Sequence, residues 1–554
     1  MMLISLLLVP LIGSLLLLFI PENNSQNEGR MKVIALSTSL INLFISILLW
    51  VQFDSNISGY QFILEFNELS FCHFNIGIDG ISLYYVLLTT FITPIALLSN
   101  YKNIYKNVKY FLISFLILET LQIALFVVLD LFLFYIFFES VLPVLFIIII
   151  VYGSGVNRIR SALLFFLYTL AGSLFMLLAI LQIYSYVGST DFQFISLNEI
   201  SLESQKILWL AFFLAFAVKT PLWPLTGWLY RAHADSPLAG SILLAGTILK
   251  FATYGYIRVL INLLPDASHY FGPLVQTIAV VTLIYSSLAT IIQQDTKSLI
   301  AYSSIAHMSV VILGLFSNSI QGIEGAILLS LAHGFVSPAL FICVGGIIYE
   351  RTGTRIIHYM RGLVTYMPVF TILFFIFTLA NTGVPLSLNF LGEQLSLIGI
   401  WNHSPIVAAV GATGIVLSAC YSIYLYNRLS YGLYSPHLKP VQDISRLEFN
   451  LLIALLIPTI VLGIFPNVIL DSLHLSVSSL IYNIAIYPHI NDPLNNTIIL
   501  LSVLYLSSVN GNGDGNDLNN KIKNLSLKIK ETGKQDFFEW FSGFCDGESN
   551  FSID

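Results

Sequence analysis

Apolar runs of about twenty residues recur along this chain, and they restrict its fold more than any other feature. A helix of about 20 residues spans the hydrocarbon of a bilayer, where only helices and closed barrels pair all their backbone groups. We therefore expect an all-α polytopic membrane protein. The runs predict fourteen membrane helices, at residues 1–20, 32–51, 81–100, 110–129, 131–151, 161–187, 206–229, 238–263, 271–291, 298–316, 322–349, 365–390, 404–427 and 448–465.

The composition agrees with this class. Of the 554 residues, 56% are hydrophobic and 10% are charged, whereas a soluble domain carries about 25% charged residues. The first run has no basic segment before it and no A-x-A cleavage site, so we interpret it as a retained helix. The cysteines show no CxxC spacing, which argues against an iron–sulfur or zinc site. They are Cys72, Cys343, Cys420 and Cys545.

Charge alternates between successive loops. Lysines and arginines collect in the loops after odd-numbered helices, from Arg30 in the first to Arg446 in the last. Loops after even-numbered helices carry acidic residues instead, among them Asp79, Asp191 and Asp266. The positive-inside rule places the odd loops on the side of synthesis and the N-terminus on the opposite side. We call these two sides the basic face and the acidic face. One miscounted helix would destroy the alternation.

Several ionisable side chains lie inside the predicted helices. A charge at the centre of a bilayer costs roughly 2.5–3.5 kcal/mol on insertion scales, so such residues need partners or water and are candidates for function. The structural alternatives are that the lysines reach an interface, that Glu139 caps a helix, that the histidines only pack, and that Glu393 faces water. Arg231, His233 and Asp235 fall in a loop, where we expect loop chemistry. The candidates are Glu139, Lys219, Lys250, His307, His333 and Glu393.

Prolines interrupt two of the predicted helices. Pro221 and Pro224 follow Lys219 in the seventh helix, and Pro385 precedes Glu393 in the twelfth. Within a membrane, such prolines free backbone carbonyls and break the helix. The two helices are five apart, and an odd spacing turns one copy of a repeat upside down relative to the other. Paired interrupted helices therefore predict a transport site between inverted repeats formed by helices 4–8 and 9–13.

Several stretches resemble the antiporter-like proton-translocating subunits of respiratory complex I. They are LFYIFFESVLPVLF, AFAVKTPLWPLTGWLYRAHADSPLAGSILLAGTILKFATYG, SLIAYSSIAHM, LAHGFVSPALF and NFLGE. The resemblance covers roughly residues 1–485 and implies fourteen helices, two inverted five-helix repeats and interrupted helices 7 and 12. It gives the six candidates roles: Glu139 and Lys219 as a pair, Lys250 as the central lysine, His307 and His333 as connecting groups, and Glu393 as the terminal carrier.

The resemblance also implies the setting. It implies a multi-pass protein of the mitochondrial inner membrane whose partners are other membrane-arm subunits. NADH, FMN, iron–sulfur centres and ubiquinone are then expected in other subunits, and the sequence holds no GxGxxG or Walker loop. No nucleic acid is expected for residues 1–485. The expected domains are the N-terminal helices 1–109, the repeats 110–263 and 271–427, a last helix with an amphipathic segment 428–485, and a polar tail 486–554.

These observations predict a mechanism. Protons would pass from Lys219 through His307 or His333 and Lys250 towards Glu393. Making or breaking the pair of Glu139 and Lys219 would shift the lysine between holding and releasing a proton. Moving one charge against 100 mV costs about 2.3 kcal/mol, and this energy must come from outside the chain.

Two other functions stay open. An Mrp-type cation/proton antiporter subunit would share the lysines, but a sodium site needs carboxylates and carbonyls at an unwound segment, and acidic residues are few in the helices. The tail segment DFFEWFSGFCDGESNFSI resembles the first motif of a LAGLIDADG homing endonuclease, with Asp546 at the metal-binding position. An active nuclease needs a second motif and a basic DNA-binding surface. We therefore expect an intron-derived tail without nuclease activity.

Overall fold

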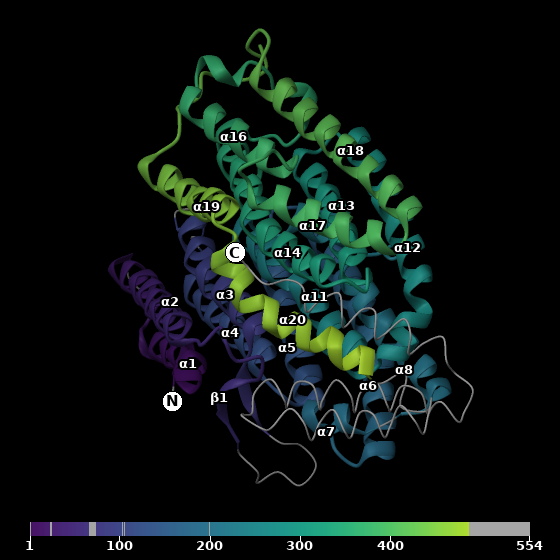
Figure 1. Ribbon diagram of the computed structural model, residues 1–554. Coiled ribbons are helices and arrows are strands. Elements are labelled where there is room, and N and C mark those ends of the chain that lie inside the picture. The colour runs from purple at the N-terminus through teal and green to yellow at the C-terminus, as the bar shows by residue number, and fades with distance from the viewer. Residues whose placement is uncertain are drawn as a thin grey trace, which may run out of the picture. The chain divides into compact units, whose positions relative to one another are not determined.

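The computed structural model describes residues 2–22, 25–65, 74–101, 104, 106–198 and 200–486. Residues 1–484 form one compact unit, and almost all described residues belong to it. Figure 1 shows this unit as a set of closely packed helices. The tail beyond residue 486, with Asp546, lies outside the described residues, so the predictions about it stay predictions.

The helices before the first interruption follow the predicted runs. Several of them begin at an acidic N-cap on the acidic face, where a carboxylate accepts from backbone N–H groups that lack a partner within the helix. The Asp79 carboxylate accepts from the Ser82 amide, and the Asp191 carboxylate accepts from the Gln193 amide. The helices are α1 Met2–Phe19, α2 Ser25–Gln52, α3 Gly80–Ser99, α4 Val108–Val127, α5 Leu131–Tyr152, α6 Arg158–Val187 and the short α7 Phe192–Leu197.

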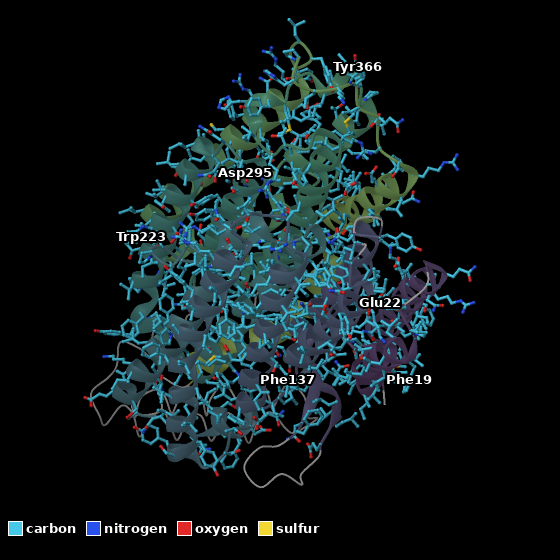
Figure 2. The ribbon with its side chains drawn as sticks, turned by 180° about the vertical axis from the view of Figure 1, so that it is seen from behind. Phe19, Glu22, Phe137, Trp223, Asp295 and Tyr366 are labelled. Atoms are coloured by element: carbon cyan, nitrogen blue, oxygen red, sulfur yellow. The ribbon has the colours of Figure 1, made fainter. Side chains whose placement is uncertain are left out.

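The seventh membrane helix is interrupted where the prolines predict. Helix α8 Leu202–Lys219 is followed by a break at residues 220–228. Helix α9 Leu229–Asp235 begins after the break. Trp223 in the break is 46% exposed, and Figure 2 labels it at the edge of the molecule. Within the break, the Trp228 Nε1 donates to the Val218 carbonyl at 2.8 Å, which satisfies a carbonyl that the interruption leaves free.

The eighth membrane helix is buried along its whole apolar length and contains two π-helical turns. The sequence analysis did not predict these turns. A π turn widens the helix by one residue and disturbs the regular pairing of carbonyls, and such turns occur mostly at functional sites. The helix runs as α10 Leu238–Leu243, η1 Leu244–Ile248, α11 Leu249–Gly255 and η2 Tyr256–Ile261.

The second half of the chain repeats the pattern of long helices with one interruption. Helix α16 ends at Asn381 and α17 begins at Leu388, with Pro385 between them. The predicted end of this span at residue 390 is wrong, because Ser387 caps a new helix by accepting from the Phe390 amide. The elements are α12 Pro265–Ile292, α13 Thr296–Leu315, α14 Ile320–Phe341, η3 Ile342–Ile348, α15 Tyr349–Thr352, η4 Ile357–Tyr359, η5 Leu363–Thr365, α16 Pro368–Asn381, α17 Leu388–His403, α18 Pro405–Ser430, α19 Arg446–Ile464 and α20 Asn467–Ile486.

The number of spans agrees with the expected multi-pass fold. Within the described ranges, twelve helices are long and apolar enough to cross a membrane. The remaining predicted spans are the interrupted pairs α8–α9 and α16–α17, of which neither half qualifies alone. Helix α20 corresponds to the predicted amphipathic segment. It lies against α3, where the Tyr84 hydroxyl and Ser472 Oγ are 2.6 Å apart.

A small sheet lies on the acidic face between α2 and α3. Strands β1 Gln61–Leu64 and β2 Ile76–Ile78 pair antiparallel, with Gln61 opposite Ile78 and Leu64 opposite Ile76. The sequence analysis did not predict it, because strands of three and four residues give too short an alternating pattern.

Glycines bring α14 and α17 into backbone contact. A Cβ on Gly392 would lie 2.5 Å from the Leu329 amide nitrogen, and one on Gly399 would lie 2.4 Å from the Gly322 Cα. The two helices therefore run antiparallel in a fixed register. Helices α6 and α8 approach closely in the same manner, since a Cβ on Gly172 would lie 3.2 Å from the Ala215 Cα.

Candidate functional site

Lys250 lies at the start of α11, directly after the first π turn, and is fully buried. Its Nζ donates to the Ala245 carbonyl at 2.6 Å and lies 2.9 Å from His333 Nδ1. Ala245 belongs to the π turn, where the altered pairing makes a carbonyl available to the ammonium group. The backbone thus fixes the Lys250 head group beside α14.

Two histidines continue from Lys250 to a carboxylate. The rings of His333 on α14 and His307 on α13 have centroids 6.0 Å apart. His307 Nδ1 lies 3.3 Å from Glu393 Oε1 on α17. All four side chains are at most 4% exposed. We call Lys250, His333, His307 and Glu393 the buried row.

The contacts give the buried row an order that differs from the predicted one. The sequence analysis placed a histidine before Lys250, whereas the structure has both histidines between Lys250 and Glu393. The reason is that α14 packs against both the π turn η1 and α17, so its histidine bridges the two. In the described part of the chain, the Nε2 atoms of His307 and His333 have no hydrogen-bond partner. Buried nitrogens without a partner are sites for ordered water.

A small cavity lies beside Glu393. It has a volume of about 10 Å³ and is lined by His307, Glu393 and Tyr421, among others. This is close to the smallest volume that holds one water molecule. The Tyr421 hydroxyl is buried and has no hydrogen-bond partner among the described residues. The far end of the buried row therefore has both the space and the polar groups for a water.

Lys219 has very different surroundings. It is 1% exposed, and its Nζ has no hydrogen-bond partner in the described ranges. The Nζ lies 4.7, 5.8 and 5.9 Å from the ring centroids of Phe138, Phe165 and Phe251, whose faces attract a cation. Glu139 follows Phe138 on α5 and acts on Lys219 electrostatically, but the Lys219 Nζ makes no direct contact with it. We call these five residues the Lys219 site.

His233 is a residue that the sequence analysis assigned to a loop, which is wrong. It lies in α9, it is fully buried, and its ring stacks on Phe341 with centroids 4.7 Å apart. Neither ring nitrogen has a partner among the described residues, and both Lys250 and Lys297 act on the ring electrostatically. Its place in a short helix after a break, which a hydropathy pattern does not reveal, explains the error.

Lys297 is a buried residue that the sequence analysis did not single out. It is 3% exposed at the start of α13, and its Nζ donates to the Ser236 carbonyl at 2.7 Å. Its neighbour Asp295 caps the helix, and Figure 2 labels this residue. Lys297 and His233 extend the polar groups from Lys250 towards the basic face.

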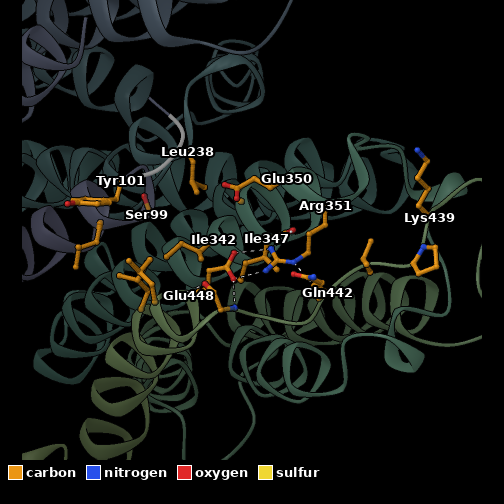
Figure 3. A pocket seen from close by; sticks show the side chains of 17 residues that line it. Ser99, Tyr101, Leu238, Ile342, Ile347, Glu350, Arg351, Lys439, Gln442 and Glu448 are labelled. Carbon is orange, nitrogen blue, oxygen red and sulfur yellow. Dashed lines mark hydrogen bonds and ion pairs between the residues drawn. The ribbon is translucent and has the colours of Figure 1, made fainter. Parts of the chain in front are cut away.

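A pocket of about 440 Å³ opens on the basic face (Figure 3). Its wall includes Leu238 and Gly346, and a Cβ on Gly346 would lie 2.7 Å from the Leu238 Cδ2. A Cβ on Gly345 would lie 3.4 Å from the Lys297 Cε. Lys297 therefore stands directly behind the pocket wall.

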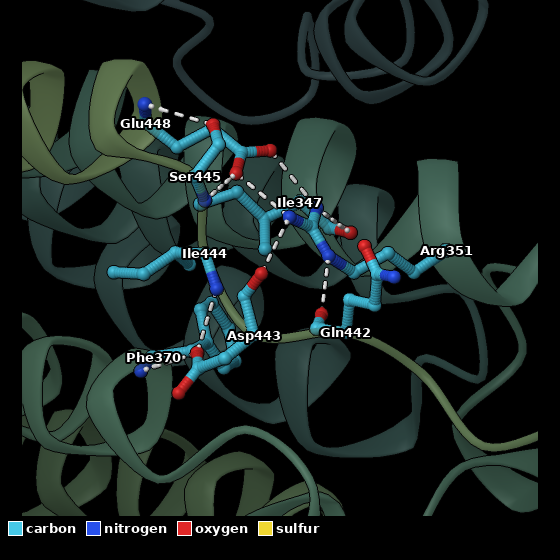
Figure 4. A network of polar contacts seen from close by, with 8 residues as sticks. All are labelled: Ile347, Arg351, Phe370, Gln442, Asp443, Ile444, Ser445 and Glu448. Atoms are coloured by element: carbon cyan, nitrogen blue, oxygen red, sulfur yellow. Dashed lines mark hydrogen bonds and ion pairs between the residues drawn. The ribbon is translucent and has the colours of Figure 1, made fainter.

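A polar network closes one side of this pocket (Figure 4). The Arg351 Nη1 and Nη2 donate to the two carboxylate oxygens of Glu448 at 2.9 and 2.7 Å, and Nε donates to the Gln442 carbonyl at 2.8 Å. A bidentate pair of this kind fixes geometry as well as charge. The network ties the loop before α19 to α15. Among the described residues, no group of three or more His, Cys, Asp or Glu side chains is placed to hold a metal ion.

Comparison with protein families identifies the core of the chain. Residues 128–418 match the family model described as NADH:quinone oxidoreductase/Mrp antiporter, TM. This range contains all six candidate residues. NADH-ubiquinone oxidoreductase chain 4 of Mycosarcoma maydis is 62% identical over 482 residues, which cover 87% of this chain and 100% of that protein. Chain 4 of Marchantia polymorpha is 46% identical over 479 residues, covering 86% and 96%.

Solved structures share the fold. A chain of respiratory complex I from Thermus thermophilus with bound NADH aligns with a TM-score of 0.79 at 27% identity, covering 87% of this chain and 100% of that one. A chain of the Mrp complex from Dietzia sp. DQ12-45-1b aligns with a TM-score of 0.76 at 17% identity, covering 87% and 99%. At that identity the second likeness shows the fold alone.

Proposed function

Because the chain belongs to the NADH:quinone oxidoreductase/Mrp antiporter family, we propose that it carries protons through the buried row and that the Lys219 site controls their passage. The chain is a proton-translocating membrane subunit of respiratory complex I, and through that complex it is part of an oxidoreductase. The resemblance drawn from the sequence is confirmed by the 62% identical chain 4 of Mycosarcoma maydis.

The contact between Lys250 Nζ and His333 Nδ1, at 2.9 Å, is the observation that carries the proposal. An ammonium group inside the membrane costs roughly 2.5–3.5 kcal/mol, so such a lysine needs polar partners or a function that uses its charge. Here its partners are one carbonyl and one imidazole nitrogen. A neutral imidazole accepts a proton at one nitrogen and releases it from the other, so His333 can pass a proton onward.

The remaining steps need water and a final acceptor. The ring centroids of His333 and His307 are 6.0 Å apart, and a bridging water between their partnerless Nε2 atoms would span this gap. From His307 Nδ1 the proton reaches the Glu393 carboxylate at 3.3 Å. Uptake from the basic face would follow Lys297 and His233, which lie between the pocket and Lys250.

The Lys219 site would act as the switch. Glu139 stabilises a charged Lys219 through its field, and this effect falls as the distance between the two grows. A change in their separation would alter how strongly Lys219 holds its proton, and the altered charge would in turn act on Lys250. The energy for this change comes from electron transfer in other subunits.

The setting follows from the same family. NADH, FMN, iron–sulfur centres and ubiquinone would be bound by other subunits, and the partners would be other membrane-arm subunits and lipid in the mitochondrial inner membrane. Residues 1–485 would bind no nucleic acid. The domains would be the N-terminal helices 1–109, inverted repeats at 110–263 and 271–427, the segment 428–485 and the tail. The similar close approach of α6 to α8 and of α14 to α17 supports the repeats.

Lys250→Met tests the proposal in the purified complex. We expect proton pumping per NADH to fall at least about tenfold, equivalent to about 1.4 kcal/mol, because methionine fills the space but holds no proton. The measurement is NADH-driven acidification of proteoliposomes beside NADH:quinone electron transfer. Lys206→Met is the control, since Lys206 lies over the Tyr270 ring near the acidic-face end of α8. Normal pumping by the Lys250 variant would contradict the proposal.

The alternatives have separate tests. An Mrp-type cation/proton antiporter would respond when Na⁺ replaces K⁺ in the flux assay, whereas the proposed subunit pumps equally in both. Truncation after about residue 490 would leave assembly of the complex intact if the tail is an intron-derived addition. A truncated chain that fails to assemble would instead give the tail a structural role.

A further inference from the structure

The polar stripe of the eighth helix continues past Lys250 towards the acidic face. Lys250 and Tyr254 lie one α-helical turn apart on α11, and Arg258 on the following π turn donates from Nε to the Tyr254 hydroxyl, so the three groups follow one side of the helix. A proton on Lys250 would therefore find two polar groups in line between itself and the acidic face.

Arg258 contacts three side chains. Its Nη2 forms an ion pair with the Asp79 Oδ1 at 2.5 Å, and its Nε donates to the Tyr254 hydroxyl at 3.0 Å. The guanidinium also lies 5.0 Å from the Tyr60 ring centroid. Asp79 is itself fixed as the N-cap of α3 through a capping box with Ser82. Arg258 and Asp79 are 5% and 4% exposed, so both charges are neutralised within the protein.

Tyr254 is equally constrained. Its hydroxyl donates to the Phe126 carbonyl at 3.1 Å and accepts from Arg258, so its one proton is already engaged. Its ring packs at 5.3 to 6.2 Å from a layer of aromatic rings that are at most 1% exposed. These rings are Tyr85, Phe126 and Phe134. Between Lys250 and Arg258 the polar group of the stripe is the Tyr254 hydroxyl, and its proton is already donated to the Phe126 carbonyl.

The chemistry of Arg258 stops proton transfer. A guanidinium remains protonated in proteins, so it can neither accept a second proton nor release its own. A buried lysine differs, because it gives up its proton readily.

We propose that Arg258, held by Asp79 and Tyr254, closes the acidic-face end of the eighth helix to protons. Protons on Lys250 then leave only along the buried row or back to the basic face. This inference rests on the proposed function of Lys250. It gives the Asp79–Arg258 pair a role in preventing back-leak, in addition to joining α3 to the eighth helix.

The test is the passive proton leak of proteoliposomes that contain the purified complex without NADH. In Arg258→Lys we expect an imposed pH gradient to decay at least about threefold faster than in the wild type, because a buried lysine exchanges protons where the guanidinium cannot. Arg351→Lys is the matched control. Arg351 also forms a partly buried pair with a carboxylate, at 2.7 Å, but it lies on the basic face away from this stripe. Its variant should hold the gradient.

A double variant tests the path of the leak. Adding Lys250→Met to Arg258→Lys should restore the tight membrane, because the leaking proton no longer has a carrier on the inner side. An Arg258→Lys complex that assembles and holds the gradient as the wild type does would overturn the inference. Should this variant fail to assemble, Arg258→His is assayed in the same way, because an imidazole also exchanges protons, and a wild-type leak in the assembled variant overturns the inference. Loss of pumping in Lys250→Met alone tests the proposed function, so the two failures are distinguishable.

Discussion

In the buried row, Lys250 and Glu393 each contact a histidine directly, whereas the Lys219 ammonium group lies over aromatic rings and has no hydrogen-bond partner in the described part of the chain. The first arrangement fixes each group against a partner that exchanges protons. The second holds a charge by cation–π attraction, which is worth about 0.5–2 kcal/mol and offers no acceptor for a proton. Both lysines are almost fully buried, but the chemistry available to them differs.

Under the proposed function, this difference assigns conduction to the buried row and control to the Lys219 site. Groups within hydrogen-bond distance pass protons, and so the buried row is suited to conduction. A lysine without a hydrogen-bond partner acts on its surroundings through its field, which reaches farther than a contact. The four predictions below test this division, from the largest expected effect to the smallest.

Lys219→Ala should have the largest effect, because it removes the charge through which the control region acts. We expect pumping to fall to background and coupled electron transfer to fall at least about tenfold. The assay is NADH-driven acidification together with NADH:quinone activity. Lys206→Ala on the same helix is the control and should retain both. Near-normal pumping in Lys219→Ala would contradict a controlling role for the Lys219 site.

Replacement of Glu139 should have the next largest effect. In Glu139→Gln the field on Lys219 is lost, and we expect pumping to fall by roughly fivefold to tenfold, or about 1–1.4 kcal/mol. Glu139→Asp keeps the charge, so it should retain more activity than Glu139→Gln. Because the Lys219 Nζ does not touch the carboxylate, the length of the side chain matters less than its charge. Equal loss in both variants would indicate a contact and not a field.

The two histidines should differ from each other by a smaller amount. His333→Gln removes the 2.9 Å contact with Lys250, whereas His307→Gln removes the longer 3.3 Å contact with Glu393. We expect roughly a fivefold loss of pumping for the first and about twofold for the second, because a water in the adjoining cavity replaces the His307 contact. The variants are compared at equal levels of assembled complex. A greater loss of pumping in His307→Gln would show that the His307–Glu393 contact matters more than the Lys250–His333 contact.

Phe138→Leu should have the smallest effect. Leucine fills most of the volume but removes the ring that lies 4.7 Å from the Lys219 Nζ. A cation–π contact is worth about 0.5–1 kcal/mol or somewhat more when desolvated, so pumping should change by about two- to fivefold. Phe165→Leu, whose ring lies 5.8 Å away, should change it less. Unaltered pumping in both variants would show that the rings only fill space.

The membrane fold was largely predictable, because a run of about twenty apolar residues crosses the hydrocarbon as a helix, which pairs all its backbone groups. The interruptions at Pro221 and Pro385 were predictable for a local reason, the missing amide of proline. The restart of the twelfth span at Ser387 was not, since a cap competes with the apparent end of the apolar run. The π turns of the eighth helix leave no mark in hydropathy, yet one of them supplies the carbonyl that binds Lys250.

The candidate site was predictable as a set of residues but not as an arrangement. An isolated charge in an apolar run identifies Lys219 and Lys250 without any tertiary information. The order of the histidines depends on which faces of α13 and α14 meet α17, and a sequence does not specify that. The sequence analysis placed His233 in a loop and did not single out Lys297, because both stand next to loops, where a polar residue needs no explanation.

The tether between the Lys250 ammonium and the Ala245 carbonyl has a consequence for proton transfer. A lysine side chain that is free to move changes rotamer within picoseconds to nanoseconds and could carry a proton from one partner to another by that motion. A lysine held by a hydrogen bond to its own helix keeps one position, so proton donors and acceptors must come to it. Its proton exchange then depends on a neighbour already within hydrogen-bond distance, so the position of His333, and not motion of the lysine side chain, directs the proton.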